Sequence, residues 1–469
     1  MLSKEYSEIK KAIQASPLED GMTVSFHHHL RNGDYVLNMV MSVIADLGFR
    51  DLTVNASALF TCHAPLLEHI REGVVTGLEC NYMDATLGEE VSRGLLAKPV
   101  IFRSHGGRPA DLARKDAQID VAFIAASSAD CAGNCNGFDG RSAFGSIGYA
   151  MADAEFAQHV IVISDHKAAY PLQRASIDET KVDAVVFVDS IGDPEKIVSG
   201  TTRVSRDPIA LLMADAAVDV IAASGLFEDG FSFQTGAGGT SLAVAQAVSE
   251  RMVGEGIQGS FASGGITGML VDMLQAGLFQ NLLDVQCFDR AAVDSIKQDP
   301  RHIEISAMRY ASPEAKSNVA QHLDVVILGA TEIDLEFNVN VHTDSNGIIM
   351  GGSGGHSDTA AEAAMSMIIA PLYRARLPLI VERVGCISTP GKDVDVLLTQ
   401  FGLAVNPLRR DLKERFQAAG LPLFELDDLK SKAEQICGVP QPIKKKDRTV
   451  ALVRSRDGEI LDRIYELGS

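Results

Sequence analysis

The segment from Thr331 to Asp358, TEIDLEFNVNVHTDSNGIIMGGSGGHSD, holds the residues whose types and spacing best suit the binding of an anion. Several carboxylates precede a loop with four glycines in five residues, Gly351, Gly352, Gly354 and Gly355. Backbone N–H groups left bare at a glycine turn, followed by a helix N-terminus, suit phosphate, carboxylate or an acyl oxyanion. A tight hairpin with a flexible turn is the alternative interpretation.

Two strands and a helix must position this loop. Apolar residues alternate with polar ones from Leu335 to Val341, which predicts a half-buried strand, and Asn346-Gly347 favours a tight turn. Pairing across the turn would bring Gly351–Gly355 alongside Glu336–His342. The stretch DTAAEAAMSMII then predicts a helix capped by Ser357 or Asp358.

Two further glycine-rich turns follow predicted strands. In QTGAGGT, the glycines Gly236, Gly238 and Gly239 open a helix, although Ser241 stands where a dinucleotide fingerprint needs its third glycine. This turn is either a pantetheine or phosphate contact or a structural connection. Ser263-Gly264-Gly265 has the same predicted setting between strand and helix, and two such turns suggest an extended anionic ligand.

Three adjacent histidines, His27, His28 and His29, lie in VSFHHHLRNGD. Neighbouring residues of a strand point to opposite faces, so the three cannot converge on one ion, and we predict no metal site. We expect one or two of them, with Arg31 and Asn32, to bind or orient carboxylates.

Two other polar motifs leave more than one interpretation. Arg103, in RSHGGR after the strand PVIF, is equally suited to binding a carboxylate and to forming loop salt bridges. Cys131 and Cys135 form one pair without a matching second pair, which is too weak a pattern for zinc. The sequence also lacks the P-loop and HExxH motifs of common kinases and metalloproteases. The string GGSGG at 351–355 fits GxSxG by its letters, but we interpret it as the glycine loop and not as a hydrolase elbow.

Composition limits the protein class. A formal net charge of -20 argues against a general nucleic-acid binder, because such proteins need a basic face. Seven cysteines in 469 residues favour a reducing compartment over a disulfide framework. Neither a membrane-spanning stretch nor an apolar signal core is recognisable, so we predict a cytoplasmic protein.

Continuous apolar runs alternate with helical stretches in both halves, as in VAFIAASSAD, HVIVISDH and GFSFQTG. This pattern predicts α/β architecture with parallel-rich sheets covered on both faces. The length exceeds what one core usually spans, and we place a domain boundary near 224–230, giving domains 1–225 and 226–469. The last segment, RTVALVRSRDGEILDRIYEL, predicts a closing hairpin around Asp457-Gly458.

Five strings of the sequence, in order along the chain, closely resemble the α subunits of citrate lyase, which are citrate CoA-transferases. They are SFHHHLRNGD, QTGAGGTSLAV, FASGGITG, GATEIDLEFNVN and GGSGGHSDTAAEAA. The resemblance implies two similar CoA-transferase-type α/β domains. It also implies that citrate replaces acetate on an acetyl thioester, which a CoA-like prosthetic group on an acyl carrier (γ) subunit holds. Acetyl-CoA is then a possible free surrogate, and a β subunit that cleaves the citryl thioester completes an oligomeric complex. One departure is Gln400-Phe401 before GLAVNP, where these subunits usually carry a more acidic or polar dipeptide.

Related CoA-transferases use a nucleophilic glutamate on the turn that aligns with Ser263-Gly264-Gly265, and this chain has no carboxylate there. The resemblance therefore implies that the citrate carboxylate attacks the thioester itself and forms a mixed anhydride, which the released thiolate reopens. Glu332 is the reserve candidate for a nucleophile. The α subunit of citramalate lyase, a thioester hydrolase and a non-catalytic ligand-binding protein are the alternatives.

Overall fold

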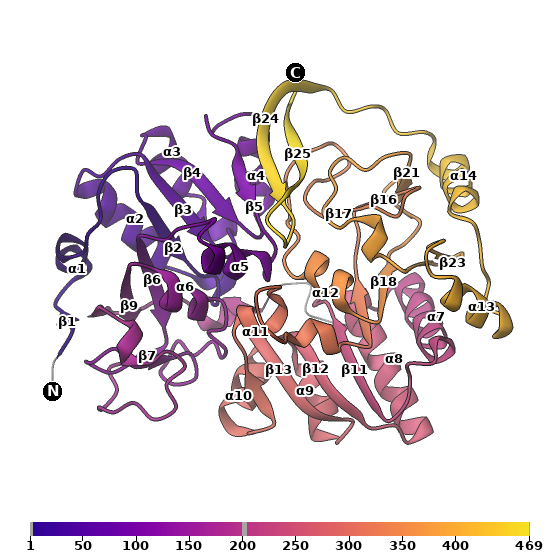
Figure 1. Ribbon diagram of the computed structural model, residues 1–469, viewed down its shortest axis with the longest axis horizontal. Helices are drawn as coiled ribbons and strands as arrows, with labels where there is room; N and C mark the ends of the chain where they lie inside the picture. Colours follow the sequence, from indigo (N-terminus) through magenta and orange to yellow (C-terminus); the bar gives the residue numbers. More distant parts are fainter. Residues whose placement is uncertain (1–2, 199–203, 469) are drawn as a thin grey trace.

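The computed structural model describes residues 3–198 and 204–468. Two large sheets lie side by side, one in each half of the chain, with helices packed on them (Figure 1). The prediction of an α/β fold with parallel-rich sheets is confirmed.

The first sheet has ten strands in the order β1-β10-β9-β6-β2-β3-β4-β5-β24-β25, and all neighbours are parallel except the last pair. All six residues of its central strand β6 are buried, as expected for a parallel strand with both faces covered. Its strands are β1 Glu5–Tyr6, β2 Thr23–Phe26, β3 Leu52–Ala56, β4 Val75–Cys80, β5 Val100–Phe102, β6 Val121–Ala126, β9 His159–Ser164, β10 Ala184–Phe187, β24 Lys445–Arg454 and β25 Ile460–Leu467. The helices of this half are α1 Ile9–Ala15, α2 Val36–Asp46, α3 Leu66–Arg71, α4 Ala85–Ser92, α5 Gly107–Arg114 and α6 Ala150–Phe156, and β7 Ser128–Ala129 pairs with β8 Cys135–Asn136.

The second sheet has eight strands in the order β14-β13-β12-β11-β15-β18-β22-β23, again parallel except for the last pair. Its strands are β11 Gly230–Thr235, β12 Gly259–Ile266, β13 Phe279–Cys287, β14 His302–Glu304, β15 Val325–Leu328, β18 Met365–Ile369, β22 Val396–Thr399 and β23 Gly402–Val405. The helices are α7 Pro208–Ser224, α8 Gly239–Glu255, α9 Gly268–Gln275, α10 Arg290–Gln298, α11 Ala307–Ala311, α12 His356–Glu362, α13 Arg410–Ala418 and α14 Leu426–Cys437. A small sheet, β17-β16-β21, joins Val339–Asn340, Glu332–Asp334 and Ile380–Val381, and β19 Tyr373–Arg374 pairs with β20 Leu377–Pro378.

The C-terminal hairpin crosses from the second half back to the first. β24 pairs in parallel with β5, with Ala451 opposite Val100, so the last strands of the chain complete the first sheet. In Figure 1 this hairpin, in yellow, lies at the junction of the two halves. The predicted hairpin is thus present, and the two halves are joined by sheet pairing as well as by packing.

Two predicted elements are wrong. The helix predicted for DTAAEAAMSMII ends at Glu362, and its apolar end is strand β18, fully buried between β15 and β22. The strand predicted from Leu335 to Val341 is broken at Phe337, whose φ is +65°. The reason is a turn in which the side chain of Asp334 accepts the N–H groups of Glu336 and Asn338 at 3.0 Å each.

No helix among the described residues is long and apolar enough to cross a membrane.

Candidate functional site

The histidine cluster follows the carboxyl end of β2, at the edge of the sheet where parallel α/β folds bind ligands. The His27 ring stacks with that of His29 at a centroid distance of 5.7 Å, and its Nε2 lies 3.0 Å from Asp153 Oδ2. Asp153 is also held by the Arg108 guanidinium at 2.5 and 2.8 Å. The structure therefore places His27 in a buried ion-pair network.

His28 and His29 stack with Tyr149, which precedes α6, at centroid distances of 5.0 and 6.0 Å. His105 packs on the same ring at 4.4 Å. Burial lowers the pKa of all three imidazoles, that of His105 to about 3, so they are neutral near pH 7. They can therefore act as hydrogen-bonding groups but not as fixed cations.

The hydrogen bonds of His28 define which nitrogen is free. Ser57 Oγ accepts the backbone N–H of His28 at 3.2 Å and lies 2.6 Å from its Nδ1. A hydroxyl that accepts from that N–H can donate its own proton to Nδ1, which leaves Nε2 protonated. His28 is then poised to donate from Nε2 to a ligand carboxylate.

Arg31 supplies the cation of this cluster. Its guanidinium lies over the Phe288 ring at 4.8 Å and near that of Phe60 at 5.6 Å, and its Nη1 is buried without a hydrogen-bond partner among the described residues. No described carboxylate lies within 4.0 Å of it, and burial lowers its pKa. An unpaired buried charge is costly, so an anionic ligand here would be favoured.

The Ser263–Gly265 segment lies beside Phe288, whose ring also supports Arg31. The prediction that it forms a turn between a strand and a helix is wrong. β12 continues to Ile266 with a bulge between Gly264 and Gly265, and Gly264 has φ +101°. Ser263 Oγ donates to the backbone carbonyl of Leu283 at 3.0 Å. A Cβ at Gly265 would overlap the Phe288 ring, so Phe288 fills the space that a side-chain carboxylate would need.

The Gly351–Gly355 loop is held by backbone contacts with both halves. A Cβ at Gly351 would overlap the carbonyl of Val341, so this end of the loop lies beside the Glu336–His342 segment, whereas the other glycines of the loop contact other parts of the chain. At Gly352 a Cβ would overlap the carbonyl of Asn81. Gly354 has φ +53°, and its carbonyl accepts the His105 N–H at 2.7 Å. The glycines thus allow close packing, and Gly354 borders the histidine cluster.

The helix after this loop has Gly355 as its N-cap without a side-chain cap, so the predicted cap at Ser357 or Asp358 is wrong. Asp358 instead accepts from Ser104 Oγ at 2.6 Å and from the Gly106 N–H at 2.7 Å in the first half. Burial raises its pKa to about 6. Asp358 therefore ties the glycine loop to the histidine side of the site.

The Gly236–Gly239 turn has the most open surroundings. Gly236 and Gly238 are exposed, and Gly238 is the N-cap of the 17-residue helix α8. A Cβ at Gly238 would meet nothing within 4 Å. The turn thus leaves space beside a helix N-terminus.

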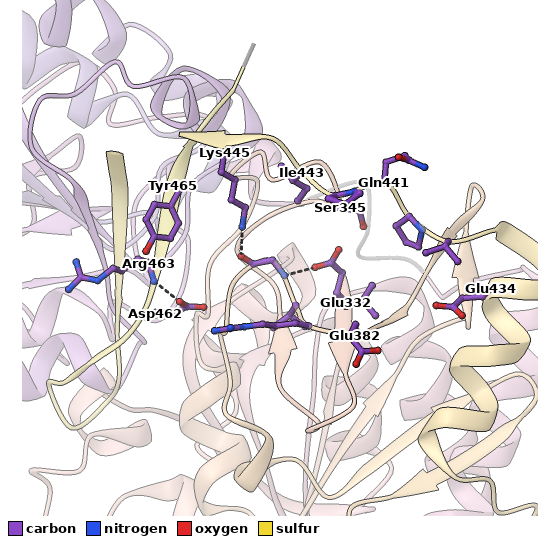
Figure 2. A pocket seen from close by; sticks show the side chains of 17 residues that line it. Glu332, Ser345, Glu382, Glu434, Gln441, Ile443, Lys445, Asp462, Arg463 and Tyr465 are labelled. Carbon is purple, nitrogen blue, oxygen red and sulfur yellow. Dashed lines mark hydrogen bonds between the residues drawn. The ribbon is translucent and has the colours of Figure 1, made fainter. Parts of the chain in front are cut away.

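Three other predicted residues lie outside this cluster. Arg103 donates to Glu79 and Asp111 at 2.7 Å each, and Asn32 is exposed. Glu332 accepts from Asn340 Nδ2 and the Gly385 N–H at 3.0 Å and faces a different cavity (Figure 2).

Buried polar atoms without a protein partner gather around the cluster. Most buried polar groups in proteins are hydrogen-bonded, so such a concentration indicates a place for a polar ligand. The atoms are both ring nitrogens of His29, His105 Nδ1, Arg31 Nη1, Gln234 Oε1 and Gln286 Oε1.

One group of potential metal ligands occurs among the described residues, Asp284, Cys287 and His302. Asp284 Oδ2 lies 2.9 Å from Cys287 Sγ and 2.9 Å from His302 Nε2, which is a hydrogen-bonded arrangement. The absence of a metal stays a prediction.

Sequence reasoning missed several residues of this site. Tyr149 is stacked with the histidines, and Gln286 Nε2 donates to the His28 carbonyl at 3.2 Å. Tyr310 receives a hydrogen bond from Gln234 Nε2 at 2.8 Å, and Phe288 supports Arg31. They lie in segments without a motif, so no local signal could have found them.

The fold resembles that of solved CoA-transferases. It is similar to the solved 4-hydroxybutyrate CoA-transferase of Porphyromonas gingivalis, with a TM-score of 0.58 and 18% identity over 92% of this chain and 97% of that one. At this identity the likeness concerns the fold alone.

The chain belongs to the citrate lyase α subunit family, because the model of that family matches residues 3–467. It is 48% identical to the citrate lyase alpha chain of Escherichia coli (strain K12) over 98% of this chain and 90% of the relative. It is also similar to the solved putative α subunit of citrate lyase from Streptococcus mutans, a complex with citrate. That TM-score is 0.98, with 46% identity over 100% of this chain and 92% of that one. The family predicted from the sequence motifs is therefore confirmed.

Proposed function

We propose that this protein is the citrate CoA-transferase subunit of a citrate lyase. It exchanges citrate for acetate on the acetyl thioester of an acyl carrier subunit. The observation that carries this proposal is the buried Arg31 guanidinium, which has no carboxylate partner in the described part of the chain and lies beside a neutral His28. A tricarboxylate would supply the missing anion, and His28 Nε2 would donate a hydrogen bond to it.

The reaction needs no side-chain nucleophile. A citrate carboxylate oxygen attacks the carbonyl carbon of the acetyl thioester and expels the thiolate, giving an acetyl–citryl mixed anhydride. The thiolate then attacks the citryl carbonyl carbon, forming citryl thioester and releasing acetate. Phe288 over Gly265 leaves no room for a carboxylate at that position, which supports this route over an acyl-enzyme.

The protein's own contribution is positioning and electrostatics. Arg31 and His28 would hold citrate from the first half, and the bulged Gly264–Gly265 strand and Gly354–Gly355 would approach the thioester from the second. Holding two reactants in an attack geometry converts an intermolecular step into an effectively intramolecular one. Gly236–Gly239 would contact the pantetheine part of the thioester. We also propose that the subunit works in an oligomer with β and acyl carrier subunits.

The test is to incubate the purified chain with acetyl-CoA and citrate and to follow citryl-CoA and acetate by mass spectrometry. Formation of both in equal amounts is expected. Acetate formed without citryl-CoA would indicate a thioester hydrolase, and neither product would indicate a binding protein. Replacing citrate with citramalate in the same assay distinguishes the citramalate lyase alternative.

A further inference from the structure

A cavity of about 700 Å³ opens on the far side of the small β17-β16-β21 sheet, between the C-terminal hairpin and α14. Figure 2 shows its arrangement: Glu332 lies at the floor, and Lys445 of β24 reaches in from above, with its ammonium 3.3 Å from the Gly385 carbonyl oxygen. The segment from Pro440 to Ile443 forms part of its wall. The histidine cluster does not line this cavity.

A second, smaller cavity of about 230 Å³ adjoins the first at Ser345, which lines both. Its walls include Ala330 and Ala370, which follow the carboxyl ends of β15 and β18, and Met350, which precedes the Gly351–Gly355 loop. The lining is mainly apolar and aliphatic. The two cavities together lead from the hairpin to the edge of the second sheet, beside the glycine loop.

Exposed glycines continue along this edge of the second sheet. β11 and β15 are adjacent parallel strands, with Thr235 opposite Ile327, so Gly236 and Gly329 follow neighbouring strand ends. A Cβ at Gly329 would meet nothing within 4 Å, and both glycines are exposed. An extended chain could therefore lie against bare backbone here.

The acidic side chains that line the larger cavity have hydrogen-bond or ion-pair partners, whereas two of its basic side chains have no carboxylate partner among the described residues. Its lining carries four carboxylates. Glu382 and Glu434 lie 3.4 and 2.9 Å from Lys430, Asp462 accepts the Ile387 N–H at 2.7 Å, and one oxygen of Glu332 accepts from Asn340 and the Gly385 N–H. By contrast, neither Lys445 nor Arg383 has a carboxylate within 4.0 Å in the described part of the chain. In a chain of net charge -20, two such cations beside one cavity are a local site for an anion.

We propose that these joined cavities hold the phosphopantetheine-type arm of the thioester substrate, with its phosphate at Lys445 and Arg383. This proposal rests on the proposed function. The apolar inner cavity suits the alkyl parts of such an arm, and the second carboxylate oxygen of Glu332 can accept from an amide N–H or hydroxyl of the arm. The thioester end would lie at the glycine loop, opposite the citrate groups.

The test uses two probes that differ only in the phosphate, acetyl-4′-phosphopantetheine and acetylpantetheine. In the double variant Lys445→Ala, Arg383→Ala, we expect the KM for the phosphorylated probe to rise at least about tenfold, as for one lost charge-assisted contact. The KM values for acetylpantetheine and citrate should not change. Equal effects on both probes, or none on either, would overturn the proposal.

Arg463→Ala is the matched control. Arg463 lies on the same hairpin, also lines the cavity and has no carboxylate partner within 4.0 Å among the described residues, but its guanidinium points away from Lys445 (Figure 2). It should leave both KM values unchanged. Calorimetry with phosphopantetheine and pantetheine measures the same discrimination without turnover, so a failure of the transferase proposal remains distinguishable. With the acetylated carrier as donor, we expect the double variant to show the same rise in KM. A rise with the carrier but not with the free phosphorylated probe would also refute this assignment.

Discussion

Replacing Arg31 with alanine should separate citrate binding from thioester binding. Its guanidinium is buried among aromatic rings, where a pair with a carboxylate is desolvated, and loss of one partner of such a pair costs about 2–5 kcal/mol. Taking about 3 kcal/mol, Arg31→Ala should lower kcat/KM for citrate roughly 150-fold. The affinity for acetyl-CoA should change little. His28→Ala should act in the same direction, more weakly, because it removes a neutral hydrogen-bond donor.

The stability of the free protein provides an independent readout. Arg31 has no carboxylate within 4.0 Å in the described residues, so its removal leaves no buried anion unpaired. Burial lowers its pKa, which means that the folded chain disfavours its charge. The melting temperature of Arg31→Ala should therefore stay the same or rise. Arg103→Ala should lower stability by about 1–3 kcal/mol instead, because it removes one charged partner each of Glu79 and Asp111, while Arg114 and Arg454 still pair with Asp111.

Arg174→Ala is the matched control for these measurements. Arg174 also has a positive φ, 57° against 52° for Arg31, and its guanidinium also lies over an aromatic ring, Phe138 at 4.2 Å. It is outside the histidine cluster. Initial rates at varied citrate and fixed acetyl-CoA, and the reverse, give the two KM values. Equal losses for both substrates in Arg31→Ala, or a loss matched by Arg174→Ala, would refute the assignment of Arg31 to citrate.

Three further predictions concern chemistry, the glycine loop and pH. Turnover should involve no acyl-enzyme, so borohydride after incubation with acetyl-CoA should leave activity intact; a trapped, reduced glutamate would contradict this. Gly354→Val should abolish transfer and also strain the fold by about 1–2 kcal/mol, because φ is +53° there, whereas Gly354→Asn tolerates that backbone and isolates the steric effect beside His105. Normal turnover in both variants would make the loop only a turn. Burial raises the pKa of Glu304 to about 7 from an ordinary 4.5. Its stabilising contribution is therefore complete below pH 4.5 and is lost as pH rises to about 7 and beyond, by about 3 kcal/mol. Glu304→Gln should flatten that part of the unfolding free energy measured against pH by denaturant titration, and an unchanged slope would show that Glu304 does not titrate as stated.

The sequence predicted the fold class because both sheets are built from continuous apolar runs. The run at 121–126 is strand β6, and that at 159–164 is its neighbour β9. Local pattern failed where tertiary pairing decided the outcome. Met365–Ile369 follows a helix in an alanine-rich stretch, yet its pairing with β15 and β22 makes it a strand. The pairing of β24 with β5 joins residues some 350 positions apart, which no local period can reveal.

The site was predictable only where a motif marked it. His28, Arg31, Gly264 and Gly354 stand in conspicuous strings. The structure brings His28 and Arg31 to Gln286 and Phe288 at the end of β13, which pairs with the strand that carries Gly264. Which of these residues can contact a ligand depends on the direction of each side chain. His27 is adjacent to His28 but turns to Asp153.

Phe288 connects the chemistry of the two sides of the site. Its ring fills the space above Gly265 that a nucleophilic carboxylate would need, and the same ring carries the Arg31 guanidinium. The same ring therefore borders both the position that lacks a carboxylate and the cation that we propose to bind citrate. If the incoming citrate carboxylate is itself the attacking group, it must be held in place of the missing side chain, and a cation above Phe288 would be well positioned to hold it.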